Sequence, residues 1–439
     1  MRIALRLENR AWRLRRVLAC HHVVLNRQVL GQTASVPRRF NNALHSASFE
    51  GRDQQLTTTQ RGLKMVHKAG NTHPIAPAPS DRIVSVDALR GFDMFWIVGG
   101  GPLVVEFLRL FSNPLPPGLE RHFDHVEWEG FVGWDLIMPL FMFIVGVSMP
   151  FSFGKRLARG DSRESIYRKV LWRTLMLFIL GMIAQGNLLE FNLNTLHLYC
   201  NTLQAIAAGY LISAVALVEL PVRWQVVLAG ALLVLFWLLM AVVSVPGQGY
   251  GVFTPDGNLA MWIDKAVLGR FQDGTTYTWI LSSLPFGATV LIGVLAGHLL
   301  RLKQPGPRKV VLLVASALGC LLGGWLSSFA FPIIKHIYSS SMVLWASGWS
   351  LLLLALFYWV IDVLGFRRWA FPFTVIGMNA IAAYMAPHFI DFRFSGQALF
   401  GGVAGHLGAF ENLLLAFGDF GALWVILYYL YRNRTFIRI

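Results

Sequence analysis

The chain has 439 residues, of which 55% are hydrophobic and only 14% are charged. Soluble domains carry about 25% charged residues, so this composition excludes an ordinary soluble protein and indicates an all-α, polytopic membrane protein. The net charge of +15 does not point to a nucleic-acid partner, because residues 1–80 hold 13 Lys and Arg against 3 Asp and Glu and carry two thirds of it.

Residues 1–80 are predicted to be a separate, basic leader. They lack the continuous apolar stretch and the small-residue cleavage site of a secretory signal. We expect either a disordered leader or an over-extended start, with Met65 as a natural initiator. Residues 81–439 form the second predicted domain, which holds every expected membrane segment.

The second domain contains about ten segments with the length and low charge of a membrane-spanning helix, which needs about 20 apolar residues. The glycine-rich run 396–410 is either a re-entrant segment or an eleventh helix. The ten helices are predicted near residues 88–111, 133–153, 172–188, 199–219, 224–244, 282–300, 309–328, 341–361, 371–387 and 411–431.

The first predicted segment begins with two ionisable residues on one helix face. Asp87 and Arg90 are three residues apart, and charged groups entering a membrane are costly unless they are paired. They predict either a functional pair or a salt bridge that anchors the helix end. The run Gly-Gly-Gly-Pro at 99–102 then predicts a break in the same helix, where the backbone can approach a ligand.

A histidine among carboxylates precedes the second predicted segment. His125 lies between Asp124 and Glu127, and Trp128 follows them. Imidazole exchanges a proton near neutral pH, and a neighbouring carboxylate can fix its tautomer. The loop therefore predicts a general base at the membrane surface, oriented by Asp124 or Glu127. The alternative is a polar interfacial loop in which Trp128 anchors the headgroup level.

The three cysteines, Cys20, Cys200 and Cys320, are far apart in the sequence. They offer neither a disulfide framework nor the ligand spacing of a zinc site, so no metal is expected. We interpret them as small apolar side chains.

Positive charge in the connecting loops predicts how the helices are oriented. The loops after the even-numbered segments, with the C-terminal tail, hold 17 Lys and Arg, and the loops after the odd-numbered segments hold 5. Cytoplasmic loops retain an excess of Lys and Arg. Both termini are therefore expected in the cytoplasm, with the loop 112–132 on the outer side.

Four motifs after residue 81 form a set. The block from His125 to Ser148 is the most specific of them, and Leu203-Gln204 begins the fourth predicted segment. Gly-Met-Asn at 377–379 marks the ninth segment, and Arg82-x4-Asp87-x2-Arg90 opens the first. From about residue 82 to the C-terminus, this set resembles the heparan-alpha-glucosaminide N-acetyltransferase family and its bacterial relatives.

The resemblance implies an activity and a site. In that family an acetyl group from cytosolic acetyl-CoA is delivered across the membrane to a terminal glucosamine, and the family's histidine falls on His125. This histidine either deprotonates the attacking amine or is itself acetylated. We expect the acetyl-CoA contacts to be Arg82, Asp87, Arg90, Gln204 and Asn379, and the acceptor contacts to be Trp128, Glu129, Asp135 and His388. The alternative for Gln204 and Asn379 is that these amides hold neighbouring helices together.

The chain departs from the family's best-known members at three places. They carry an asparagine before the glycine cluster, where residues 97–99 here read Ile-Val-Gly, and Trp-Asn-Gly where residues 128–130 here read Trp-Glu-Gly. Their late histidine matches His388 only with a one-residue shift at Pro387. A heparan-type acceptor is therefore not assumed, and Glu129 favours a cationic acceptor.

The predicted function is transfer of an acetyl group from acetyl-CoA to an amino sugar or related glycan on the outer side of a bacterial inner membrane. The expected partners are acetyl-CoA, the glycan acceptor and the lipid bilayer, with a homodimer left open. The rival is a transporter or flippase of a small solute or lipid-linked sugar, because a broken segment and intramembrane polar residues are also typical of transporters.

Overall fold

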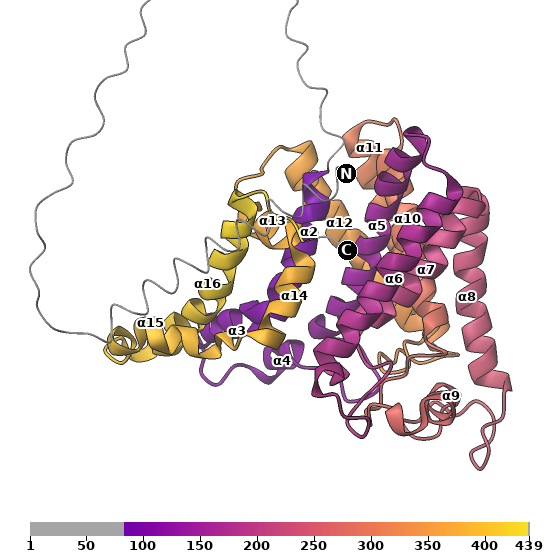
Figure 1. The fold of residues 1–439 in the computed structure, drawn as a ribbon, viewed down its shortest axis with the longest axis horizontal. Helices are drawn as coiled ribbons and strands as arrows, with labels where there is room; N and C mark the ends of the chain where they lie inside the picture. The colour runs from indigo at the N-terminus through magenta and orange to yellow at the C-terminus, as the bar shows by residue number, and fades with distance from the viewer. Residues whose placement is uncertain (1–82, 438–439) are drawn as a thin grey trace, which may run out of the picture. The chain divides into compact units, whose positions relative to one another are not determined.

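The computed structural model describes residues 83–437, so the predictions for the leader, Cys20 and Arg82 concern residues outside this range. Within the range the chain is helical and forms no β-strand, which confirms the predicted fold class (Figure 1). The α-helices are α2 (Val84–Phe95), α3 (Gly101–Arg109), α4 (Pro117–Glu120), α5 (Ile137–Ala158), α6 (Arg163–Gln185), α7 (Thr202–Glu219), α8 (Val222–Val242), α9 (Leu259–Leu268), α10 (Ser283–Arg301), α11 (Gly306–Ser328), α12 (Ser340–Phe357), α13 (Phe371–Met378), α14 (Ala380–Phe389), α15 (Ser395–Ala404) and α16 (Glu411–Arg432).

Eight helical segments of the described residues are long and apolar enough to cross a bilayer, fewer than the ten predicted. The predicted segment 371–387 is divided between α13 and α14, which meet at Asn379 and contain 8 and 10 residues. The short helix α15 covers the first part of the predicted run 396–410. The helix α6 is long enough, but its last 18 residues carry three cationic side chains, namely Arg168, Lys169 and Arg173.

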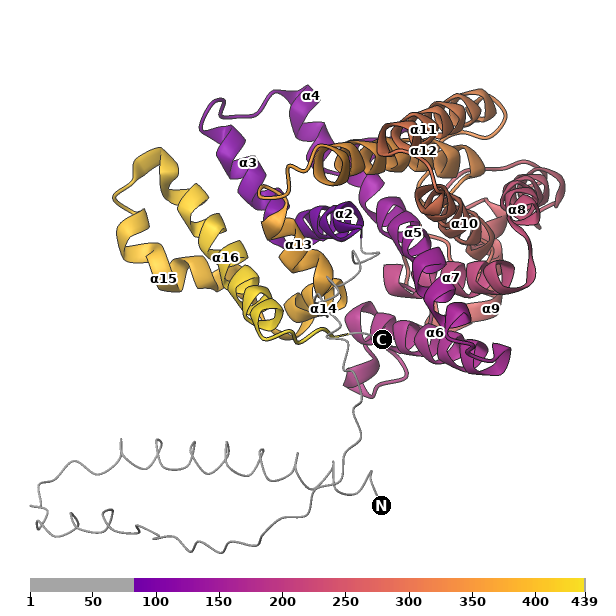
Figure 2. The same ribbon diagram turned by 90° about the horizontal axis from the view of Figure 1, so that it is seen from above.

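The middle of the bundle is formed by α5 and α10, which lie between α2 and α8 in Figure 2. The apolar part of each is 67% buried, against 17% for α11 and for α16. The two backbones approach closely because Gly146 and Gly293 lie at their crossing, where added Cβ atoms would collide with the carbonyl oxygens of Val290 and Phe143. Small residues at such crossings are typical of helix packing in membranes.

The predicted break in the first segment is present. The helix α2 passes into α3 through the π-helical turn η1 (Trp96–Gly100), where Val98 and Gly99 leave helical dihedral angles. Gly99 has a φ of 117°, which glycine adopts without the steric conflict of a Cβ atom. The turn places Ile97 at the wall of a cavity.

Loops from distant parts of the chain meet at one end of the bundle, which we call the His125 end. Figure 1 shows α4 and α9 at this lower end. Glu129 pairs with Ile334 in an isolated antiparallel β-bridge, and Leu198 N donates to Phe271 O at 3.1 Å. The loops after the first, third, fifth and seventh predicted segments therefore share one end of the molecule.

Candidate functional site

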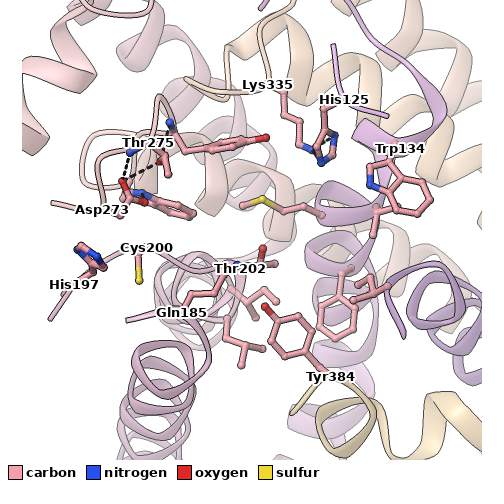
Figure 3. Close-up of a pocket in the computed structure, with 18 of the residues that line it drawn as sticks. His125, Trp134, Gln185, His197, Cys200, Thr202, Asp273, Thr275, Lys335 and Tyr384 are labelled. Carbon is pink, nitrogen blue, oxygen red and sulfur yellow. Dashed lines mark hydrogen bonds between the residues drawn. The ribbon is translucent and has the colours of Figure 1, made fainter. Parts of the chain in front are cut away.

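A cavity of about 690 Å³ opens at the His125 end of the bundle, and we call it the His125 chamber. Side chains of α5, α6, α7 and α14 line it together with the loops that follow α9 and α11. In Figure 3 His125 and Lys335 lie side by side, with His197 and Cys200 on the far side. Aromatic walls with a few polar groups suit a small organic ligand. Among the lining residues are His125, Trp134, Gln185, Asp273, Lys335 and Tyr384.

The carboxylate that reaches the His125 ring belongs to Asp135. The ring Nδ1 lies 2.8 Å from Asp135 Oδ1, and Asp135 Oδ2 accepts a hydrogen bond from the Val132 N–H at 3.1 Å. Asp135 is fully buried in the turn η3 (Gly133–Leu136) that leads into α5, so the backbone fixes its position. When Nδ1–H is donated to Asp135, Nε2 keeps the lone pair that a base needs.

The two carboxylates expected to orient His125 occupy other positions. Asp124 Oδ1 accepts a hydrogen bond from the backbone N–H of His125 at 2.7 Å, so it shapes the loop and not the ring. The Glu127 side chain is exposed. A catalytic role for Asp124 or Glu127 stays a prediction, whereas the geometry gives the orienting position to Asp135.

A buried lysine also contacts this histidine, and we did not predict it from the sequence. Lys335 Nζ lies 2.9 Å from Nδ1 and 3.3 Å from Nε2 of His125, and 3.4 Å from Asp135 Oδ1. The lysine side chain is only 6% exposed. Burial lowers the pKa of Lys335 to about 8, although the Asp135 carboxylate opposes the shift. The side chain is therefore mostly protonated at neutral pH.

Ring packing and hydrogen bonds hold the loops around these three residues. The Trp128 indole N–H donates to Phe253 O at 2.9 Å. The His336 ring stacks on Tyr277 with 4.2 Å between the ring centroids. Burial and the neighbouring Lys335 lower the pKa of His336 to about 4, so this ring is neutral at physiological pH. His336 thus packs the wall of the chamber without adding a charge.

None of the four predicted acceptor contacts is among the residues that line the chamber, and Asp135 is fully buried beside His125. Trp128 packs behind the wall, and Glu129 is exposed beside its β-bridge. His388 is exposed at the end of α14, where its Nδ1 lies 3.0 Å from Tyr384 O. Tyr384, one turn earlier, does line the chamber. The role of Trp128, Glu129 and His388 as acceptor contacts stays a prediction.

The described residues offer no metal site and no reactive thiol at this position. No group of three His, Cys, Asp or Glu side chains within residues 83–437 is placed to hold a metal ion. Cys200 lines the His125 chamber, but burial raises its pKa to about 12. The Cys200 side chain is therefore a protonated thiol, as expected of an apolar filler.

A second cavity of about 480 Å³ lies beside the first turns of α2, and we call it the Arg90 chamber. Arg90 donates to Ser148 Oγ at 2.6 Å and lies 3.4 Å from Asp87 Oδ1. Lys155 and Arg173 line the same cavity, and Arg173 Nε is buried without a hydrogen-bond partner among the described residues. Three cationic side chains around one cavity suit a ligand that carries phosphates.

The two chambers share one wall. Phe141 of α5 and Leu203 and Ile206 of α7 line both cavities. The helix α2 also runs along both, with Arg90 at one cavity and Met94 at the other. The cationic cluster and His125 therefore line two cavities that adjoin at these apolar side chains.

The amides of Gln204 and Asn379 hydrogen-bond the chain's own backbone. Gln204 Nε2 donates to Leu198 O at 2.6 Å, and its Oε1 accepts from Asn201 N at 3.1 Å. Asn379 Nδ2 donates to Thr435 O at 3.2 Å, which ties the break between α13 and α14 to the C-terminal segment. Neither amide lines the Arg90 chamber, so their assignment as acetyl-CoA contacts stays a prediction.

Comparison with known proteins links the chain to one family. Residues 82–319, just over half of the chain, match the family model described as heparan-alpha-glucosaminide N-acetyltransferase, catalytic. The human and mouse proteins named heparan-alpha-glucosaminide N-acetyltransferase are each 26% identical to the chain, over 428 and 431 aligned residues. These alignments cover 82% of this chain but only 60% and 62% of the two relatives. The chain therefore spans about three fifths of the length of the curated relatives it matches.

Proposed function

Because this chain belongs to the heparan-alpha-glucosaminide N-acetyltransferase catalytic family, we propose that it is a membrane-bound acyltransferase. Acetyl-CoA binds in the Arg90 chamber, and an amino sugar or related glycan binds in the His125 chamber. The observation that carries the proposal is the wall shared by the two chambers, because a cationic cluster and a histidine base line two cavities that adjoin at three apolar side chains.

The donor site follows from charge. Arg90, Lys155 and Arg173 offer N–H groups to the phosphates of acetyl-CoA, and the unpartnered Arg173 Nε supplies a buried donor. The slender pantetheine arm then passes the shared wall of Phe141 and Ile206 and presents the thioester to His125. This arrangement lets the donor stay on one side of the membrane while its acetyl group reacts on the other.

The chemistry follows from the His125–Asp135 contact. Asp135 holds Nδ1–H, so Nε2 can take the proton of the attacking amine as the C–N bond forms and the C–S bond breaks. In the alternative route Nε2 attacks the thioester, and the acetyl-imidazole then passes its acetyl group to the amine. Incubation with labelled acetyl-CoA but no acceptor separates the routes, because only the second leaves label on the protein.

The orientation in the membrane is part of the proposal. The His125 end faces outward and both ends of the chain are cytoplasmic, as the 17 to 5 distribution of Lys and Arg indicates. A single cysteine at position 121, in a variant without Cys20, Cys200 and Cys320, tests it with an impermeant thiol reagent. Labelling from the outer side of intact cells is the expected result, and labelling only from the cytoplasmic side would reverse the topology.

The decisive experiment places donor and acceptor on different sides of a membrane. Purified protein in sealed vesicles receives labelled acetyl-CoA on the Arg90 side and a panel of amino sugars on the His125 side. We expect acetylated sugar on the acceptor side without entry of CoA. If no sugar in the panel and no glycan fragment becomes labelled, the proposed function is wrong.

The same vesicles test the rival function. The helix break at Asn379 and the π-helical turn between α2 and α3 are features that transporters share, and they favour a transporter or flippase over a simple anchor. Accumulation of unmodified sugar across the membrane, with no transfer of label, would support transport and exclude the transferase.

A further inference from the structure

We propose that Lys335 is a further catalytic residue, which donates a hydrogen bond to the thioester oxygen while negative charge develops on it. This inference rests on the proposed acetyl transfer and names a role that neither His125 nor Asp135 can fill. Acyl transfer needs a donor aimed at the oxyanion, and such a donor contributes most where water is excluded.

The position of Lys335 fits this role. Its Nζ lies 2.9 Å and 3.3 Å from the two ring nitrogens of His125, and the side chain lines the His125 chamber. A thioester carbon within reach of Nε2 therefore has its oxygen within reach of Nζ. An ammonium group has three donors. The Asp135 carboxylate at 3.4 Å and the His125 ring take two of them, which leaves the third for the thioester oxygen.

The groups around Lys335 keep its ammonium protonated and able to donate a hydrogen bond. The groups that face it are the Asp135 carboxylate, the rings of His125 and His336, and Tyr277, whose ring centroid is 5.9 Å from Nζ. Asp135 is the one anion among them, and it balances the buried positive charge. Because burial lowers the pKa of Lys335 to about 8, the donor is charged at neutral pH and loses its proton in mildly alkaline solution.

The reaction balances without any change to the lysine. The amine nitrogen bonds to the carbonyl carbon, the C=O electron pair moves onto oxygen, and Lys335 donates to that oxygen. His125 takes the proton of the amine, and collapse of the intermediate breaks the C–S bond. The departing CoA thiolate takes the proton from the imidazolium. The same oxyanion forms when His125 attacks the thioester itself, so Lys335 serves either route.

The alternative is that Lys335 only balances the charge of Asp135, and two variants separate these roles. Lys335→Met removes the donor, and the double variant Lys335→Met/Asp135→Asn removes both charges, so that no buried charge is left uncompensated. Thermal melting in detergent verifies that each variant is folded. The probe is acetonyl-CoA, a stable analogue with a methylene group between the acetyl carbonyl and sulfur, labelled with ¹³C at the carbonyl and observed by difference infrared spectroscopy.

We expect the bound carbonyl to absorb at lower wavenumber in the wild-type protein than in either variant, because a donor polarises the C=O bond. In parallel, Lys335→Met should lower kcat by about 10² to 10³ with little change in the KM for acetyl-CoA. The wild-type rate should fall above about pH 8, and Lys335→Arg should lack this fall because guanidinium stays protonated.

A carbonyl band that is identical in the wild-type protein and both variants would overturn the role of Lys335 and leave the acetyltransferase assignment standing. If the wild-type protein does not bind the analogue at all, the acetyl-CoA site itself is wrong, and the inference about Lys335 falls with it.

Discussion

The two chambers are assembled in different ways. The cationic residues of the Arg90 chamber lie on faces of α2, α5 and α6, where residues one helical turn apart are neighbours in any fold, and α7 and the break between α13 and α14 complete its lining. The His125 chamber forms where loops meet, and its central contact joins His125 to a residue 210 positions later. Residue spacing in the sequence can therefore predict neighbours on a helix face, as in the Arg90 chamber. It cannot predict which loop residues contact each other, as in the His125 chamber.

The chambers are also expected to respond differently to substitution. Interactions made only in the transition state affect kcat, whereas interactions made equally in the bound ground state affect KM. Variants in the His125 chamber should therefore lower kcat, and variants in the Arg90 chamber should raise the KM for acetyl-CoA. A variant of the His125 chamber that changes only KM, or a variant of the Arg90 chamber that changes only kcat, would contradict these separate roles.

His125→Ala should have the largest effect. Loss of a general base or nucleophile lowers kcat by about 10² to 10⁴, while acetyl-CoA still binds in the other chamber. Initial rates of labelled acetyl transfer and calorimetric titration with acetyl-CoA measure the two quantities. His406→Ala, at an exposed histidine after α15, is the matched control. Near wild-type transfer by His125→Ala would remove this ring from the chemistry.

Asp135→Asn should have a smaller effect than His125→Ala, and it decides which carboxylate orients the base. An amide that replaces the carboxylate at Nδ1 weakens the hold on the ring tautomer, so we expect kcat to fall by about 10². Glu127→Gln is the control, because its side chain is exposed in the same loop. If Glu127→Gln lowered kcat more than Asp135→Asn, Glu127 would be the carboxylate that orients His125, as the sequence predicted.

Arg173→Met should raise the KM for acetyl-CoA by about 10-fold, the effect of losing a hydrogen bond to a charged group. Its kcat should remain close to that of the wild-type protein. S-acetyl-N-acetylcysteamine, a short thioester without phosphates, should show no such difference between the variant and the wild type. Arg163→Ala, at an exposed arginine of α6 that pairs with Glu219, is the control. An equal loss with both donors would contradict phosphate binding in the Arg90 chamber.

Asp264 should make the wall of the His125 chamber sensitive to pH. Its carboxylate accepts the N–H groups of Trp279 at 2.7 Å and Ile280 at 3.0 Å, and burial raises its pKa to about 6. Since this lies above the ordinary value of 3.8, the folded protein binds more protons than the unfolded chain between these pH values. The contribution of Asp264 to stability therefore falls as the pH rises from about 4 to 6 and is constant above 6.

Melting temperatures in detergent at pH 4, 5, 6 and 7 test this smallest effect. We expect the difference between wild type and Asp264→Asn to change by a few degrees below pH 6 and not above it. Asp256→Asn, at an exposed aspartate of the same loop, should show no such change. A difference that is constant across the range would exclude titration of Asp264.

Most of the fold could be predicted from the sequence, because a bilayer demands long apolar helices. The exceptions are two helical segments. The cationic residues of α6 interrupt its apolar surface. The segment 371–387 breaks at Asn379, whose side chain donates to Thr435 O. That bond joins residues 56 positions apart, so no local pattern could indicate it.

The candidate site could be predicted only in part. His125 was found because its side chain chemistry is distinctive, but its partner was sought among adjacent carboxylates and lies ten residues further on. A signal for Lys335 was present in the sequence, since it is a lone cation among Ile333, Ile334 and Ile337. A charged residue in so apolar a run is expected to be buried and paired. Its partner could not be named without the fold.

The separation of His125 and Lys335 along the chain also bears on how the protein is made. At about 5 to 20 residues per second, roughly 10 to 40 seconds pass between the synthesis of the two residues. During that interval Asp135 has no ammonium to balance it, and an unbalanced carboxylate resists entry into hydrocarbon. By then six of the eight candidate spans of the described region have been synthesised. A nascent chain that stops short of Lys335 therefore carries His125 and Asp135 without the cation that neighbours both of them in the folded protein.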